Sequence, residues 1–303
     1  SYSSFGDIQI PETDSFKWAN HYYKLGNSLL NTAGKQHGFS VSPGIIKNWG
    51  TSRLEVNLYQ HENGFFILEK MENEPLVPSY SIKSRDYSPP FQKVTDFSAY
   101  HFTDATINNK KIAFSLGYQK NNSNEYENEI ATPDLKLTLN TISTATKLTL
   151  PIDEKKVSFG LNSSYQLHKA GGTGHILPNY NKFSSGVYAL LEKPINSYWM
   201  LNLGGRSEFY NLNVSKTQKY NETLNPSFQR EYFGSAFSIG AVRSSTYSIH
   251  KINLGKTYRI PSVYELAANG YHSHNIRYEK GDTANKPEIA WQLEGSWNKN
   301  KDN

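Results

Sequence analysis

The chain has 303 residues, no cysteine and a formal net charge of +5 from 32 basic and 27 acidic residues. Without cysteine there can be no disulfide framework, thiolate metal site or cysteine nucleophile. The charges are scattered, with no basic run longer than a pair such as Lys110-Lys111, which argues against a nucleic-acid-binding tract. Apolar runs such as 65–68 fall far below the roughly 18 residues that a membrane helix needs, so we expect no transmembrane helix.

Strict alternation of apolar and polar residues is the dominant pattern, and it indicates strands with one apolar face. In chain order it covers 54–59, 112–119, 157–168, 199–209, 233–242, 252–259 and 289–297. In the clearest case, Phe159 and Leu161 alternate with Ser158 and Asn162. Many of these runs reach about ten residues, which suits tilted membrane strands, whereas strands of soluble domains are mostly about five or six residues long.

The polar faces of these strands carry charged side chains and glycine. A sandwich core could not bury such charges without partners, while the water-filled interior of a large barrel accepts them. We therefore expect Phe159, Leu161, Leu201 and Ile252 to face outward to lipid, and Gln166, Arg206 and Glu294 to face the lumen. Aromatic residues near the predicted strand ends are typical of an interfacial girdle. They are Trp49, Trp199, Tyr210, Tyr247, Tyr258, Trp291 and Trp297.

Short turns and long connections alternate along the chain. The short turns are predicted at 48–51, 108–110, 151–154, 193–196 and 243–246, and the long connections at 70–95, 121–133, 170–181, 214–229 and 261–286. Short turns on one side and long loops on the other are typical of outer-membrane barrels. We predict an all-β fold, an antiparallel transmembrane β-barrel with about 11–12 strands in this chain. The pattern is uncertain only at 135–150, where the apolar phase shifts near Asn140.

The segment 259–272, RIPSVYELAANGYH, resembles the R-A-P-x-x-x-E-L-F-x-x-G-x-H stretch of the TonB-dependent outer-membrane receptors, which import iron complexes, haem and cobalamin. Segments 278–282 and 286–288 resemble the Y-x-x-G-N and L-x-P-E signals of that family. The opening 1–7, with 31–35, is similar to an early-barrel stretch of one subgroup. The chain departs from these patterns at Ile260, Ala267, Asp282 and Asn285. The motif marks a strand and its following loop, and its residues do not define a ligand.

The resemblance implies an active transport receptor in the outer membrane of a Gram-negative bacterium, and not an enzyme. Its ligand would be a metal complex of the iron–siderophore, haem or cobalamin type, and it would have no resident cofactor. Its partners would be outer-membrane lipid, a plug domain and an energy-transducing TonB protein. Because members close a barrel of about 22 strands and no plug is visible, we expect 1–303 to be a partial barrel domain that is not stable alone in a membrane. A passive porin or a surface adhesin is the alternative.

Other site patterns are weaker. The triplet 255–257, G-K-T, lies inside a strand pattern and lacks the glycines of a phosphate loop. His272 and His274 could supply two metal ligands, and the alternating glutamates of 125–129 could bind calcium, but a solvated loop is favoured for both. No serine lies in a G-x-S-x-G elbow, so no catalytic triad is nominated, and none of the metal or nucleotide candidates has the required spacing.

The long loops carry aromatic and histidine side chains that we predict to contribute to an extracellular ligand surface. Tyrosine offers a rigid amphipathic surface at low entropic cost, which favours it in binding loops. The predicted residues are Tyr80, Tyr87, Phe91, His175, Tyr180, Tyr271 and His272. Packing within the loops is the alternative role for each of them.

Arg259 is the most informative charge of the late motif. The alternation places it on the lumen face beside Thr257, just before Pro261 ends the strand. A plug carboxylate could hold its guanidinium, and Glu294 is a second predicted partner on another strand. The alternative is a solvated charge on the barrel wall.

Overall fold

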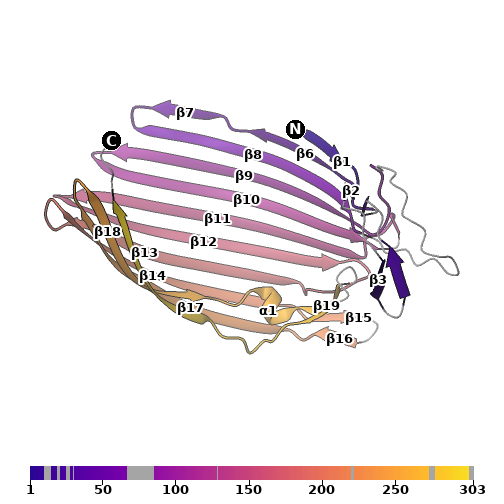
Figure 1. Cartoon of the computed structure of the whole chain (residues 1–303). Coiled ribbons are helices and arrows are strands. Elements are labelled where there is room, and N and C mark those ends of the chain that lie inside the picture. The colour runs from indigo at the N-terminus through magenta and orange to yellow at the C-terminus, as the bar shows by residue number, and fades with distance from the viewer. Residues whose placement is uncertain are drawn as a thin grey trace.

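The computed structural model describes residues 1–9, 15–18, 21–24, 28–29, 31–66, 85–127, 129–219, 222–272 and 277–299. These residues form one large antiparallel sheet, four two-stranded sheets and one short helix (Figure 1). In this part of the chain, no helix has the length and apolar character needed to cross a membrane.

The large sheet has 13 strands that follow the chain order, so neighbours in sequence pair with each other. They are β1 (Tyr2–Phe5), β6 (Gly34–Val41), β7 (Gly44–Lys47), β8 (Gly50–Gly64), β9 (Phe91–Ile107), β10 (Lys110–Tyr126), β11 (Leu135–Ile152), β12 (Lys155–Gly171), β13 (Tyr180–Pro194), β14 (Trp199–Val214), β17 (Phe228–Ser244), β18 (Ser248–Arg259) and β21 (Glu288–Lys299). β6 and β7 pair with successive parts of β8 and together cross the sheet once. The 13 strands therefore cross it 12 times. This agrees with the predicted strand number.

The remaining elements lie in the long connections at one end of the sheet. They are β2 (Ile8–Gln9), β3 (Ser15–Trp18), β4 (His21–Lys24), β5 (Ser28–Leu29), β15 (Thr217–Lys219), β16 (Glu222–Asn225), α1 (Val263–Ala267), β19 (Asn269–His272) and β20 (Arg277–Lys280). At the other end, short turns join the strands at all five predicted places. Asn108, Asn109 and Asp153 adopt positive φ angles there, a conformation that asparagine and aspartate tolerate in tight turns.

Two predicted long connections are shorter than expected. β9 already begins at Phe91, and β10 continues to Tyr126. The apolar alternation ends earlier than the strands do, because the outward face becomes polar at Lys120, Asn122 and Asn124 while backbone pairing continues. The sequence pattern therefore reported the end of the apolar surface and not the end of the strand.

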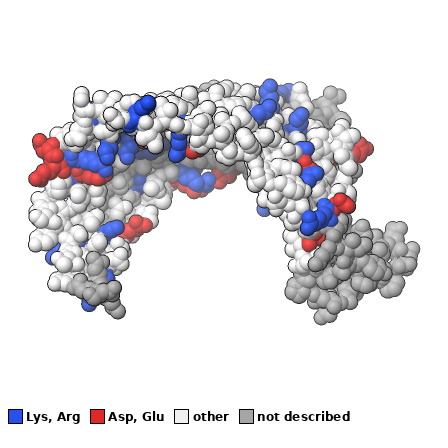
Figure 2. Space-filling view, turned by 90° about the horizontal axis from the view of Figure 1, so that it is seen from above, with Lys and Arg blue, Asp and Glu red and all other residues white. Residues whose placement is uncertain are grey.

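The sheet curves into an open trough (Figure 1), and the space-filling view shows the molecule hollowed on one side (Figure 2). α1 lies on the concave side and packs against Leu212, so side chains that share a face with Leu212 point inward. Basic and acidic side chains are visible along the wall of the hollow (Figure 2). In the described residues, β1 and β7 form one edge of the sheet and β21 forms the other.

The outward face carries an apolar band at mid-height. On β12 it runs from Val157 to Tyr165, which a strand rise of about 3.3 Å per residue and a tilt of roughly 40° convert to about 20 Å, near the roughly 25 Å of membrane barrels. Phe159, Leu161 and Ile252 lie in this band and are 48%, 45% and 56% exposed. Leu201 shares their face, because Leu201 and Ile252 are both paired with Ala241.

Exposed aromatic side chains border the apolar band on both sides. The row nearer the long loops contains Tyr118, Tyr165, Phe183, Phe209 and Phe233, and the row nearer the turns contains Trp49, Tyr198, Trp199, Tyr247 and Trp297. Trp291 stands on the same face, edge-on to Phe237 at 5.4 Å. Such double rows are typical of the two interfaces of a membrane barrel.

Two residues predicted for the girdle lie elsewhere. Tyr210 is one position out of phase with Phe209, so it faces inward, where it is 7% exposed. Tyr258 donates its hydroxyl to Glu208 Oε2 at 2.7 Å. The pairing of β18 with β17 ends at Lys256, so alternation along β17 no longer determines the direction of Tyr258.

The irregular segment 135–150 forms part of the continuous strand β11, whose pairing with β10 and β12 has no register shift. Near Asn140 the apolar residues change from the inward face to the outward face of β11, and the strand contains no bulge. Ile142 is 52% exposed on the outward face, whereas Leu139 faces inward and packs against the core.

The hydrophobic core lies on the inward face at the loop end of the sheet. Its buried members are Tyr180, Tyr210, Leu212, Val214, Val263, Leu266 and Ala267. Leu212 of β14 is fully buried beneath α1. Ser262 caps α1 and Glu265 completes a capping box, which stabilises a helix start. With five residues, α1 is too short to produce a helical period, so the sequence pattern did not predict it.

The two faces of β12 should differ in a spin-label measurement on the full-length protein in a membrane. A label at Leu161 should collide with oxygen, which concentrates in lipid, whereas a label at Gln166 should collide with a polar relaxant in the lumen. A label at Lys169 shares the face of Leu161 but lies beyond Tyr165, so it should also see the polar relaxant. Equal accessibility at Leu161 and Gln166 would contradict this arrangement.

Candidate ligand site at the loop end of the barrel

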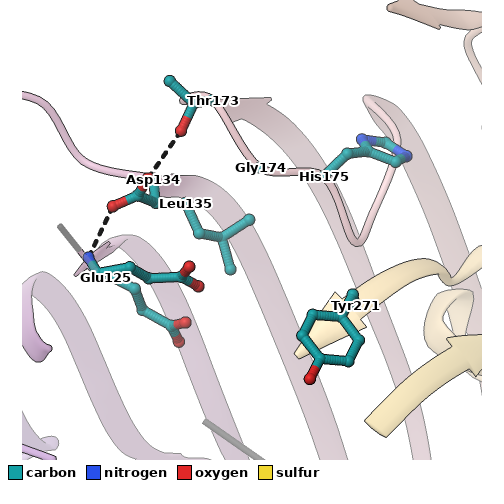
Figure 3. Close-up of a pocket in the computed structure, with 8 residues that line it drawn as sticks. Glu125, Asp134, Leu135, Thr173, Gly174, His175 and Tyr271 are labelled. Atoms are coloured by element: carbon teal, nitrogen blue, oxygen red, sulfur yellow. Dashed lines mark hydrogen bonds between the residues drawn. The ribbon is translucent and has the colours of Figure 1, made fainter. Parts of the chain in front are cut away.

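A pocket of about 280 Å³ opens where three long loops meet at the end of the trough (Figure 3). The loops follow β10, β12 and β18, so strands that are not adjacent contribute to one site. The lining residues are Glu125, Glu127, Asp134, Leu135, Thr173, Gly174, His175 and Tyr271.

Asp134 joins the first two loops. Its Oδ1 accepts a hydrogen bond from Thr173 Oγ1 at 2.9 Å, and its Oδ2 accepts one from the Glu127 amide at 2.6 Å (Figure 3). Its carbonyl oxygen accepts from the Gly174 amide at 2.5 Å. Gly172 has a φ of 96°, and a Cβ there would lie 2.4 Å from the Asp134 carbonyl oxygen. The glycine-rich stretch is therefore needed for one loop to dock on the other.

Asn225 joins the loops after β12, β14 and β18. Its side chain is buried, with Oδ1 2.7 Å from His175 Nε2, and its Nδ2 donates to the Ala267 carbonyl at 2.8 Å. The Asn269 amide donates to the Ile176 carbonyl at 2.9 Å. A Cβ at Gly270 would lie 1.8 Å from the His175 carbonyl oxygen, so this position requires glycine. These contacts hold His175 in place beside the pocket.

The pocket is acidic. Glu125, Glu127 and Asp134 line it, and no lysine or arginine is among its described lining residues. Glu125 is 8% exposed, and its Oε1 accepts a hydrogen bond from Gln92 Nε2 at 3.3 Å. Carboxylates inside a concave, partly enclosed site produce a negative potential that attracts cationic groups. Within the described ranges, no group of three or more histidine, aspartate or glutamate side chains is arranged to hold a metal ion.

The structure places the predicted ligand-surface residues in three different environments. His175 and Tyr271 line the pocket, and Tyr271 is 54% exposed. Tyr180 belongs to the core, where it stacks on His168 at 4.8 Å. Tyr87 and Phe91 lie on the outward side of the sheet, away from the pocket.

The contacts of Tyr87 and Phe91 explain their position. The Tyr87 hydroxyl donates to Glu62 Oε2 at 2.5 Å, and the Phe91 ring stacks on Tyr126 at 4.6 Å. Tyr80 lies outside the described residues. The backbone of His272 belongs to β19, and its side chain is outside the described part of the chain.

The site contains three residues that the sequence patterns above do not predict, Asp134, Thr173 and Asn225. Thr173 lies in the stretch GGTG, whose glycines are the one local signal of a close backbone approach. Asp134 and Asn225 have no local pattern, because their partners are far away in the chain. Glu125 was interpreted as a solvated carboxylate, and it is buried.

Arg206 stands on the inward wall below the pocket. Its Nη1 donates to Asn162 Oδ1 at 2.7 Å, and its Nη2 lies 3.2 Å from Glu208 Oε2. Because Tyr258 donates to the same Glu208 oxygen, three strands, β12, β14 and β18, contribute to one polar network on the wall. Glu294 also faces inward, opposite Asn253, and accepts a hydrogen bond from Gln292.

Arg259 is held by carboxylates from its own loop and from β21. Its guanidinium donates to both carboxylate oxygens of Glu265, each at 2.9 Å, and to those of Glu288 at 2.9 and 2.7 Å. The predicted partner Glu294 is wrong, because the register places Glu288 opposite Arg259 and Glu294 opposite Asn253. The hydrogen bonds from Arg259 and from Ser262 lower the pKa of Glu265 to about 2.

Acidification should loosen the start of α1. Because the folded pKa of Glu265 lies below its ordinary value of 4.5, its stabilising contribution is complete above pH 4.5 and is lost as the pH falls towards 2. The protection factor of the Leu266 amide, which is its exchange rate compared with that of an unfolded chain at the same pH, should fall over that range in the full-length protein. The Glu265→Gln variant should exchange faster at neutral pH and lose this pH dependence, whereas Glu192→Gln should behave as wild type. An unchanged pH profile in Glu265→Gln would contradict the assignment.

The Asn225→Ala substitution should loosen the loops around the pocket. It leaves the His175 imidazole and the Ala267 carbonyl without their partner, and each unsatisfied buried group costs about 1–3 kcal/mol. Proteolysis and hydrogen exchange of residues 172–179 and 260–272 should increase by a factor of about 10 or more. Asn211→Ala is the matched control, because Asn211 bonds an exposed glutamate, Glu231, on the strand. Equal protection in both variants would show that Asn225 does not hold the loops.

Comparison with known proteins identifies the family. A family model for the β-barrel of TonB-dependent receptor-like proteins matches residues 4–303. No curated protein matches the chain. Among solved structures, the copper transporter OprC has a TM-score of 0.73 at 13% identity, with 99% of this chain and 46% of that chain covered. The FrpB iron transporter from Neisseria meningitidis (F5-1 variant) has a TM-score of 0.62 at 12% identity, with 99% and 47% covered.

The chain spans about half the length of these two transporters, and at such low identity the likeness concerns the fold alone. The family model covers nearly the whole chain, and the late motif, the wall charges and the long loops on one side agree with it. The chain belongs to the TonB-dependent receptor β-barrel family.

Proposed function

We propose that residues 1–303 form part of the barrel of an outer-membrane receptor that captures a metal complex and imports it by TonB-dependent transport. Family membership supports this class of protein over a passive porin, an adhesin or an enzyme. The similar solved structures are named as a copper and an iron transporter, which supports a metal or a metal complex as the transported ligand.

The pocket at the loop end is the observation that carries the proposal. Its walls come from three loops that are tied together by Asp134 and Asn225, so it has a defined shape. Its carboxylates favour a neutral or cationic complex over an anionic one. Tyr271 is largely exposed at its rim, where an aromatic side chain can contact the organic part of a chelate.

The wall below the pocket is suited to the passage of a polar ligand. Arg206, Asn162 and Glu208 form a polar surface that faces the hollow. A plug domain would lie against this surface, and an energy-transducing TonB protein would act on that plug. The two aromatic rows on the outward face support a location in the outer membrane of a Gram-negative bacterium, with lipid against the apolar band.

Uptake assays test the proposal with the full-length receptor in a bacterial strain that lacks it. Radiolabelled iron–hydroxamate, haem, cobalamin and copper are offered separately, with and without a functional TonB protein. We expect energy-dependent uptake of at least one of them. No uptake of any probe, or uptake that does not need TonB, would refute the import role.

The pocket is tested by combining Glu125→Gln with Glu127→Gln, which removes two charges at nearly constant volume. Loss of charged hydrogen-bond partners should weaken the apparent affinity for the imported probe by about tenfold or more. The matched control combines Glu192→Gln with Glu231→Gln, which removes the same charge outside the pocket, at the turn end for Glu192 and at the loop end of β17 for Glu231. If both double variants take up the probe equally, the pocket is not the capture site.

A further inference from the structure

Five lysines lie on the outward face of the sheet, beyond the aromatic row that is nearer the long loops. These residues, here called the lysine band, are Lys35, Lys93, Lys120, Lys136 and Lys169. Pairing from β8 to β12 has no register shift, so the outward direction of these side chains follows from alternation with Leu58, Leu116 and Ile142. They lie on neighbouring strands, from β6 to β12 (Figure 1).

The heights of Lys120 and Lys169 match lipid headgroups, and Lys93 and Lys136, which the register pairs with Asn124, lie farther towards the loops. Lys120 is two residues beyond Tyr118 on β10, and Lys169 is four residues beyond Tyr165 on β12. With a rise of about 3.3 Å per residue, these lysines lie roughly 7–13 Å along the strand from the aromatic row. Aromatic girdles sit at the interface, so charges just beyond them face the polar headgroups of the leaflet on the loop side.

The register arranges three of the lysines in one row across the strands. Lys35 is paired with Glu62, Glu62 with Lys93, Lys93 with Asn124, and Asn124 with Lys136. Adjacent strands lie about 4.8 Å apart, so successive lysines in this row are roughly 10 Å apart. A headgroup with two phosphates could contact two of them at once.

The charge of the band is strongly positive. Glu62 is its one acidic side chain on the described strands β6 to β12, and its carboxylate lies 3.2 Å from Lys35 Nζ and 3.0 Å from Lys93 Nζ. This carboxylate therefore holds two ammonium groups side by side while it neutralises only one of them. Lys120, Lys136 and Lys169 are exposed.

The band is confined to one side of the molecule. At the same height, the outward positions on β13, β14 and β17 are Asn181, Asn211, Asn213, Gln229 and Glu231. None of these residues is basic. A general tendency of lysine to reach the interface from any strand does not explain the one-sided distribution, whereas a specific anionic partner on strands β6 to β12 does.

We propose that the lysine band binds the phosphate groups of a multiply phosphorylated glycolipid in the outer leaflet of the membrane. Ammonium groups are strong point-charge partners for phosphate, and a row with a spacing of roughly 10 Å favours a headgroup with more than one phosphate over a phospholipid with one. The proposal rests on the outer-membrane location given as part of the proposed function, and it is independent of the transported ligand.

The proposal is tested by measuring lipid binding to the purified full-length receptor with native mass spectrometry. The probes are bisphosphorylated lipid A, its fully dephosphorylated form and phosphatidylglycerol. The variant combines Lys93→Gln, Lys136→Gln and Lys169→Gln. Each basic side chain near an anionic membrane surface contributes roughly fivefold, so binding of bisphosphorylated lipid A should weaken on the order of 100-fold. The control, Lys110→Gln with Lys155→Gln and Lys193→Gln, removes equal charge at the turn end and should bind as wild type.

A comparison of the three lipids with the wild-type receptor alone also tests the proposal. This comparison keeps the proposal testable even if the variant does not fold. Bisphosphorylated lipid A should bind more tightly than both its dephosphorylated form and phosphatidylglycerol. Equal binding of the three lipids, or equal losses in the variant and its control, would overturn the proposal. Uptake of the imported probe is measured in parallel. Retained uptake with lost lipid binding, or the reverse, separates this inference from the proposed transport function.

Discussion

Backbone pairing is the constraint on which the rest of this structure depends. In hydrocarbon each unpaired N–H or C=O group costs several kcal/mol, so strands must pair throughout the apolar band. From β8 to β14 the sheet does so without one register shift. The unbroken register then assigns every side chain to the outward or the inward face. A slip of one residue would exchange lipid-facing and lumen-facing side chains along a whole strand.

Alternation therefore made the fold predictable from sequence, and its failures have a common physical cause. Alternation reports which face is apolar, and the apolar face changes with height on a strand. On β11, Ile142 faces outward at membrane height, whereas Leu139 faces inward at the loop end, where it packs against the core. On β14, Phe209 and Tyr210 face opposite sides, and a pattern of aromatic residues cannot tell a girdle from a core. The correct interpretation requires knowledge of what covers each face.

The candidate site was less predictable, because long-range polar contacts build it. Asn225 contacts His175 and Ala267, which lie 50 and 42 residues away, and Thr173 contacts Asp134 at a distance of 39 residues. No local spacing can encode such partners. His175 and Tyr271 were found because their residue types suit binding loops. Residue type alone also selects Tyr87 and Phe91, which lie on the outward face because Tyr87 contacts Glu62 and Phe91 is paired with Tyr126.

The late motif shows why the family can be identified from this sequence while the ligand cannot. Arg259, Ser262 and Glu265 lie within seven residues. Arg259 and Ser262 both contact Glu265, so the chemistry of the strand end and the helix cap is contained in one short stretch. Its glycine, Gly270, is required by contact with the His175 carbonyl, and that contact orients the loop that bears Tyr271. The motif thus preserves the frame on which a pocket is built. Apart from Tyr271, the pocket side chains belong to other loops, so the ligand has to be established from the assembled pocket.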